Sequence, residues 1–117
     1  LWLPTQWLGH SFHHTRFAGS ITSTSDTHIN LTETVCCLIE AEFGRVLIIN
    51  GHGGNQADMS MALQNLKEQY EDSRVFGASY WKVAEKQLDE IREATPHGWG
   101  HAGEMETSMM LAMRPDL

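Results

Sequence analysis

Hydrophobic residues three or four positions apart predict helices in four segments of the chain. These segments are 26–43, 59–70, 81–92 and 104–113. Ser25 and Asp26 supply N-cap oxygens for the first helix, and Gly44 follows its last residue. Met109, Met110 and Met113 form the apolar side of the last helix, which indicates packing into a core.

Runs of β-branched residues between these helices predict strands. Arg45–Asn50 is a short aliphatic run bounded by turn residues, so we expect a strand buried on both faces. A second strand is predicted at 74–80, with an edge strand at 1–8 and a brief strand at 20–22. Because strands alternate with helices, we expect an α/β fold with a mostly parallel sheet covered on both faces, a three-layer sandwich.

Composition narrows the class of protein. The 117 residues are 41% hydrophobic and carry a formal net charge of -7, which fits one soluble domain and argues against nucleic-acid binding. No apolar run approaches the roughly 20 residues of a membrane helix. Two adjacent cysteines, Cys36 and Cys37, and no secretory signal indicate a reducing, cytoplasmic compartment. The chain begins without Met, so we expect a piece of a longer protein.

The first candidate site is Asn50-Gly-His-Gly-Gly-Asn55, at the end of the predicted buried strand. Ligands gather at the carboxyl ends of parallel strands, and the glycines let the backbone approach a ligand while His52 points into the crevice. Two alternatives stay open. His52 would only bond a neighbouring carbonyl, or the helix N-terminus would bind an anion, although the Lys of a phosphate-binding loop is absent.

The second candidate site is the segment 97–108, where a glycine-rich loop delivers His97 and His101 before the last helix. Glu104 and Glu106 open that helix, where acidic residues also have an ordinary explanation in the helix dipole. They are two apart and so cannot share one helical face. His52 with the segment around His101 and Glu104 would form a histidine and carboxylate site for a cation such as Zn²⁺, which favours metal-assisted hydrolysis.

A third cluster, His10, His13 and His14, lies in a predicted loop, where histidines are more often surface residues than ligands. With its neighbours it completes a resemblance to the creatininase family. Gly9–His14 and Phe17–Thr22 resemble that family's Gly-x-Ser-x-Glu-His and Phe-Pro-Gly-Thr-Ile motifs. The segments 46–55 and 101–111 resemble its Asn-Gly-His-Gly-Gly-Asn and His-Ala-Gly-Glu-x-Glu-Thr-Ser motifs.

The resemblance implies a creatininase-like α/β domain over residues 1–117 with a dinuclear site of Zn²⁺ or Mn²⁺, Fe²⁺ or Mg²⁺ being further options. It implies hydrolysis of a small cyclic amide or formamide C–N bond by a metal-bound hydroxide. His52 would be a metal ligand, and His101 would pass a proton to the leaving nitrogen. In creatininase proper, a Glu at the place of Gly54 binds the second metal, and the resemblance implies that Glu104 supplies this missing ligand. Glu106 would then support the ligands without binding the metal, or would exchange roles with Glu104. The expected substrate pocket contains His14, Asn50, Asn55 and Trp99.

Departures from the family pattern qualify these expectations. His13 stands in place of the family's Glu, Ala18 in place of Pro and Ser20 in place of Thr. The family's first metal motif, Glu-x-His-Gly followed by Asp, belongs upstream of Leu1, so we expect these 117 residues alone to be inactive. The family forms hexamers, so a homo-oligomer acting on a small molecule is expected. The alternative function is a non-catalytic α/β module that binds an anionic small molecule at the glycine-rich turn.

Overall fold

The computed structural model describes residues 1–24, 26–95, 98 and 100–117. The chain divides into two compact units, Leu1–Val83 and Ala84–Leu117. The elements of the first unit are η1 (Phe12–His14), α1 (Thr27–Glu40), β1 (Arg45–Asn50), η2 (Gly53–Asn55), α2 (Gln56–Gln69), β2 (Arg74–Ser79) and α3 (Tyr80–Val83). Those of the second unit are α4 (Glu85–Ile91) and α5 (Glu104–Met113).

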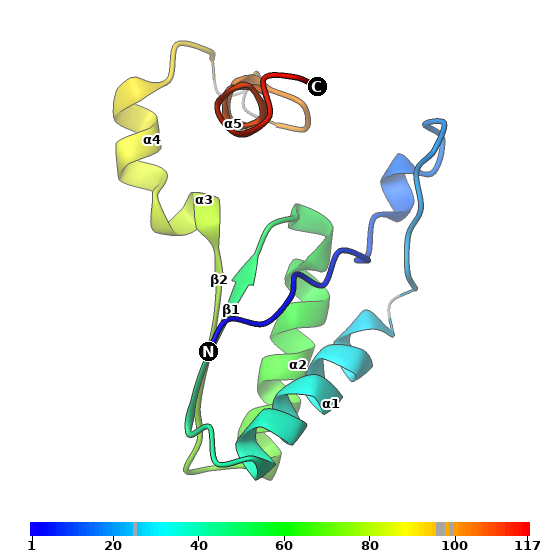
Figure 1. Cartoon of the computed structure of the whole chain (residues 1–117), viewed down its shortest axis with the longest axis vertical. Coiled ribbons are helices and arrows are strands. Elements are labelled where there is room, and N and C mark those ends of the chain that lie inside the picture. The colour runs from blue at the N-terminus through cyan, green and yellow to red at the C-terminus, as the bar shows by residue number, and fades with distance from the viewer. Residues whose placement is uncertain (25, 96–97, 99) are drawn as a thin grey trace. The chain divides into compact units, whose positions relative to one another are not determined.

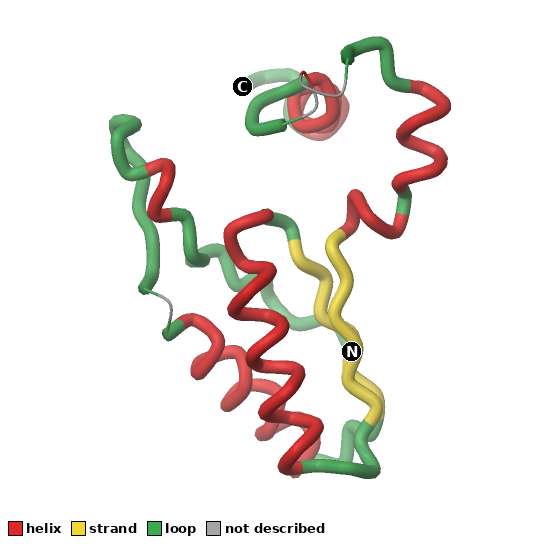
Figure 2. The backbone as a smooth tube through the Cα atoms, turned by 180° about the vertical axis from the view of Figure 1, so that it is seen from behind, coloured by secondary structure: helices red, strands yellow, loops and turns green. Residues whose placement is uncertain are grey.

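The strands β1 and β2 lie side by side and parallel, which confirms the α/β prediction (Figure 2). Their register runs from Arg45 opposite Arg74 to Asn50 opposite Ser79. This pairing brings the carboxyl ends of both strands to one edge, where parallel sheets usually carry their ligand sites.

Helices α1 and α2 run alongside each other and cover one face of the strand pair (Figure 1). Val35 of α1 and Ala62 and Leu66 of α2 are fully or almost fully buried and form the core of this unit. Gly77 of β2 lies so close to α2 that a β-carbon there would stand 2.8 Å from side-chain atoms of Met59 and Leu63. The helix layer is therefore tightly seated on the strands.

The outer face of the strands corrects the prediction that β1 is buried on both faces. Burial alternates along β1 and β2, as expected for strands covered on one side. Leu47 and Phe76 are 63% and 64% exposed, and Ile49 is also exposed. The aliphatic run indicated the strand correctly, but α1 and α2 pack on the same face.

Several predicted boundaries also change. Segments 1–8 and 20–22 are not strands, because neither pairs with β1 or β2 and a strand needs a hydrogen-bonded neighbour. The first helix stops at Glu40, ahead of the predicted Phe43, because Glu42 takes a left-handed backbone with φ 66°. The predicted helix 81–92 divides at Ala84 into α3 and α4.

The last helix occupies the predicted residues, but its apolar side is different. Met105 is its buried residue, whereas the three methionines expected in the core, Met109, Met110 and Met113, are exposed. Within the described part of the chain, no helix has the length and apolar character needed to cross a membrane.

Candidate metal site

The turn after β1 is organised by Asn50, which is buried at the carboxyl end of the strand. Its side-chain amide donates a hydrogen bond to Ser79 Oγ at 3.1 Å, which ties the ends of β1 and β2 together. Its Oδ1 accepts the backbone N–H of His52 at 3.1 Å and the amide of Asn55 at 3.4 Å. One buried asparagine therefore fixes the backbone that carries His52.

A loop from the N-terminal region (residues 9–24, here the His10 loop) docks onto this turn. The backbone N–H of His10 donates to Asn55 Oδ1 at 2.8 Å. The backbone oxygen of His10 occupies the space that a β-carbon of Gly54 would need, and such a β-carbon would also stand 2.7 Å from His52 Nε2. The absence of a side chain at Gly54 therefore permits the loop and the turn to meet.

Asp58, in the first turn of α2, contacts the same loop through His10. It is 3% exposed, and its Oδ2 lies 3.1 Å from Nδ1 of His10. Its Oδ1 lies 3.9 Å from Nδ1 of His28 at the start of α1. Sequence reasoning missed this residue, since an acidic residue in a first helical turn has an ordinary explanation and no spacing links positions 10, 28 and 58.

The docked loop brings His13 and His14 to His52. Each of the three offers a ligand nitrogen, and these atoms lie within 4.8 Å of one another. The rings of His13 and His52 are stacked with centroids 5.4 Å apart, and Ser11 Oγ lies 2.7 Å from His14 Nδ1. Among the residues that the structure describes, this is the one group of three or more histidine, cysteine or acidic side chains spaced to hold a metal ion.

A cavity of about 970 Å³ opens beside the turn. It lies between the N-terminal segment, α1 and β1, and it reaches Asn50, His52 and Asn55. Two of the expected pocket residues, Asn50 and Asn55, therefore line the same cavity as His52, the candidate metal ligand. His14, a third expected pocket residue, lies beside His52. Trp99, the fourth expected pocket residue, lies outside the described residues, as does His97.

His101, Glu104 and Glu106 belong to the second unit, where both carboxylates bind backbone. Glu104 accepts the N–H groups of Glu93 at 2.9 Å and Ala94 at 2.6 Å. These two bonds, helped by the charge of Arg92, lower the pKa of Glu104. Glu106 accepts the N–H of Ala102 at 2.6 Å, and Ala102 is itself held in a left-handed conformation with φ 51°.

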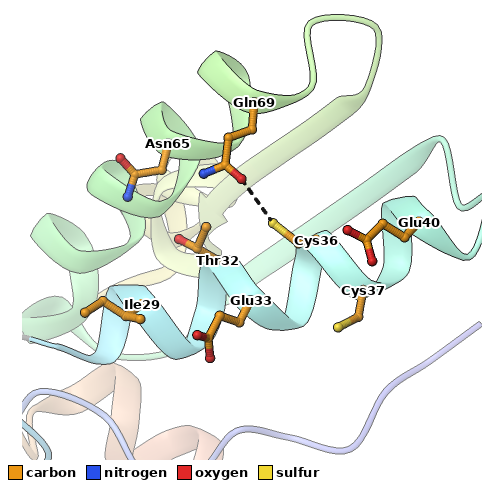
Figure 3. Close-up of a pocket in the computed structure, with 8 residues that line it drawn as sticks. All are labelled: Ile29, Thr32, Glu33, Cys36, Cys37, Glu40, Asn65 and Gln69. Carbon is orange, nitrogen blue, oxygen red and sulfur yellow. Dashed lines mark hydrogen bonds between the residues drawn. The ribbon is translucent and has the colours of Figure 1, made fainter.

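A second hollow, of about 580 Å³, lies between α1 and α2 (Figure 3). Cys36 and Cys37 line it together with Glu33 and Glu40, and Cys36 donates to Gln69 Oε1 at 3.7 Å. Hydrogen bonds to Cys36 and Glu40 raise the pKa of nearby Tyr70 to about 12. Glutamates rather than Lys, Arg or His stand beside the two cysteines in this hollow, and reactive cysteines usually sit in electropositive surroundings.

Together, the parallel strand pair, the glycine-rich turn and the three imidazoles define an α/β protein with a site suited to a metal ion. The family model for creatininase, described as creatinine amidohydrolase, matches residues 1–117. The chain therefore belongs to the creatininase family, as the sequence motifs indicated. Comparison with curated proteins gave no match.

Proposed function

We propose that this chain forms part of a metal-dependent amidohydrolase that cleaves the C–N bond of a small cyclic amide or formamide. The observation that carries the proposal is the position of His52, held by Asn50 at the carboxyl end of β1 with two further imidazoles beside it. Membership of the creatininase family supports the reaction class.

The residues present fit a divalent cation. Imidazole nitrogens are good ligands for Zn²⁺ and related ions, and three of them converge at His52. When bound, the cation would act as a Lewis acid that polarises the amide carbonyl. It would also lower the pKa of water toward neutrality, so that hydroxide becomes available as the nucleophile. Zn²⁺ and Mn²⁺ are the ions that we propose, with Glu104, or Glu106 in its place, as a further candidate ligand.

The remaining roles fall to residues beside the cavity and in the second unit. Asn50 and Asn55 line the cavity with amide groups that suit a small polar substrate. His101 is exposed and would donate the proton that the leaving nitrogen needs. The buried charge of Asp58 in the first turn of α2 makes that helix N-terminus unattractive to an anion, so it argues against the anion-binding alternative.

The test is hydrolysis of a panel of cyclic amides and N-formyl compounds by the protein expressed from its complete gene. We expect a strong chelator and His52→Ala each to abolish turnover, and His101→Gln to lower kcat while the metal content stays constant. Ser60→Ala, on the exposed side of α2, is the control and should change neither.

Two results would contradict the proposal. One is hydrolysis that is undiminished in His52→Ala. The other is a protein without metal whose melting temperature is raised by inorganic phosphate in the presence of the chelator, which would favour the anion-binding module.

A further inference from the structure

We propose that Asp58 is a positioning residue for the site at the glycine-rich turn. Acting through His10, its carboxylate sets where the His10 loop lies and so holds His14 beside His52. This inference rests on the proposed function, because it concerns the same site, but the contacts that it invokes can be measured without substrate or metal. Its failure and the failure of the proposed enzyme activity are therefore separate results.

The His10 loop is closed on itself where it leaves and rejoins the rest of the chain. The backbone N–H of Ser23 donates a hydrogen bond to the backbone oxygen of Gly9 at 2.9 Å. The backbone N–H of Ser11 donates to Thr22 Oγ1 at 2.6 Å. A surface loop of this length whose ends meet is an Ω-loop, a compact unit that packs on its own side chains. We therefore expect it to shift as a unit.

A shift of the loop carries His14 with it. Ser11 Oγ lies 2.7 Å from Nδ1 of His14, so the orientation of this ring is set inside the loop. The rings of His14 and His52 have centroids 5.4 Å apart. Because His52 belongs to the turn and His14 to the loop, the distance between the two rings depends on where the loop docks.

His10 fastens the loop at two points. Its backbone N–H donates to Asn55 Oδ1 in the turn at 2.8 Å, and its Nδ1 lies 3.1 Å from Asp58 Oδ2 in α2. An ionised carboxylate accepts hydrogen bonds and cannot donate them, so Nδ1 of His10 carries the shared hydrogen. The backbone bond holds one point of the loop, whereas the side-chain bond also fixes its rotation about that point.

The burial of Asp58 argues that the carboxylate has a role beyond the helix. Its side chain is 5% exposed, and its Oδ1 lies 3.9 Å from Nδ1 of His28 at the start of α1. A carboxylate that serves only the dipole of α2 can remain in water, whereas burial has a cost that hydrogen-bonded partners must offset.

The contact between Asp58 and His10 also lies at the wall of the cavity. Asp58 lines that cavity together with His52 and Asn55. A displaced loop would therefore alter the cavity and the spacing of the histidine rings at the same time. This links a buried carboxylate, which contacts neither strand in the turn, to the geometry of the site.

The experiment uses nuclear magnetic resonance on the whole 117-residue chain without added metal. We expect nuclear Overhauser contacts between the ring protons of His14 and His52 in the wild type. Asp58→Ala should reduce these contacts more than twofold and speed hydrogen exchange of the His10 backbone amide tenfold or more. Asp72→Ala, the same change at an exposed position after α2, is the matched control and should alter neither.

The amides of Ser11 and Ser23 are an internal reference, because their acceptors lie within the loop. In Asp58→Ala they should keep their protection while the amide of His10 loses it. That pattern distinguishes a loop that shifts as a unit from a fold that is weakened throughout, which is what a merely structural role of Asp58 would produce.

A second pair of variants tests the inference if Asp58→Ala does not fold. His10→Asn retains a side-chain N–H that can donate to Asp58, whereas His10→Leu has no donor. The contacts between His14 and His52 should persist in His10→Asn and weaken in His10→Leu.

The inference is overturned if the wild-type chain shows no contacts between these two rings, or if Asp58→Ala or His10→Leu leaves them unchanged. It is also overturned if His10→Asn weakens them as much as His10→Leu does, or if Ser11 and Ser23 lose protection together with His10.

Discussion

The backbone oxygen of His10 lies against Gly54, in the space that a β-carbon at position 54 would fill. This contact joins the His10 loop to the turn that carries His52. Its steric consequence is that the two segments meet only while position 54 lacks a side chain.

Replacing Gly54 with alanine should therefore push the loop away from the turn. We expect Gly54→Ala to lower the free energy of unfolding by about 1–3 kcal/mol, the range typical of an added methyl group in a filled space. Gly51→Ala is the matched control, because nothing lies within 4 Å of a β-carbon there. Urea unfolding measures both, and equal stability of the two variants would show that the contact is not fixed in solution.

The contact between buried Asp58 and partly exposed His10 predicts an energetic coupling between the loop and α2. Removing Asp58 leaves His10 without its 3.1 Å carboxylate partner, so Asp58→Ala should lower stability by about 1–3 kcal/mol. Glu71→Ala, at an exposed acidic position in the loop after α2, should have little effect.

A double-mutant cycle with His10→Ala then tests the pair itself. The combined loss should be smaller than the sum of the two single losses, since both changes remove the same interaction. Strictly additive losses would place the effect of Asp58 elsewhere, for instance on His28.

The lowered pKa of Glu104 predicts a pH dependence in the second unit. The cause is hydrogen bonding from the backbone of Glu93 and Ala94 to the ionised carboxylate. A folded-state pKa below the unfolded value stabilises the fold above the ordinary carboxyl pKa, and this contribution is lost as the pH falls through the folded value. In an acid NMR titration, the amide shifts of Glu93 and Ala94 should follow Glu104, and in Glu104→Gln this transition should disappear.

The raised pKa of Tyr70 predicts a pH dependence at alkaline rather than acid pH. Its pKa is raised to about 12 through Cys36 and Glu40, so its stabilising contacts persist through the ordinary tyrosine range and are lost as the pH rises through the folded value. Ultraviolet titration in a Tyr80→Phe background isolates this group. Glu40→Gln should move the transition toward about 10, the ordinary value. Glu33→Gln on the same helix is the control, and an equal shift in both variants would remove the specific role of Glu40.

The sequence predicted those features that depend on neighbouring residues. The β-branched run at Arg45–Asn50 is the observed strand β1, and the glycine-rich turn follows it where a parallel sheet carries its sites. The predicted bounds of the last helix, Glu104–Met113, were also correct, because acidic residues open it and the glycine-rich loop ends before it.

What the sequence could not show depends on contacts between distant segments. The approach of His13 and His14 to His52 requires the His10 loop to dock at the N-terminal end of α2, and that docking depends on Asn55 and Asp58. The predicted strand at 1–8 failed for the same reason, since apolar residues indicate burial but do not supply a pairing partner.

The exposed outer face of the strand pair has a consequence for handling the protein. Leu47, Ile49 and Phe76 present apolar side chains next to strand edges with unpaired backbone groups, a combination that promotes association between chains. Sedimentation and light scattering of this chain should therefore change with concentration. A charged residue at Phe76 is the simplest way to keep it dispersed without touching the histidines.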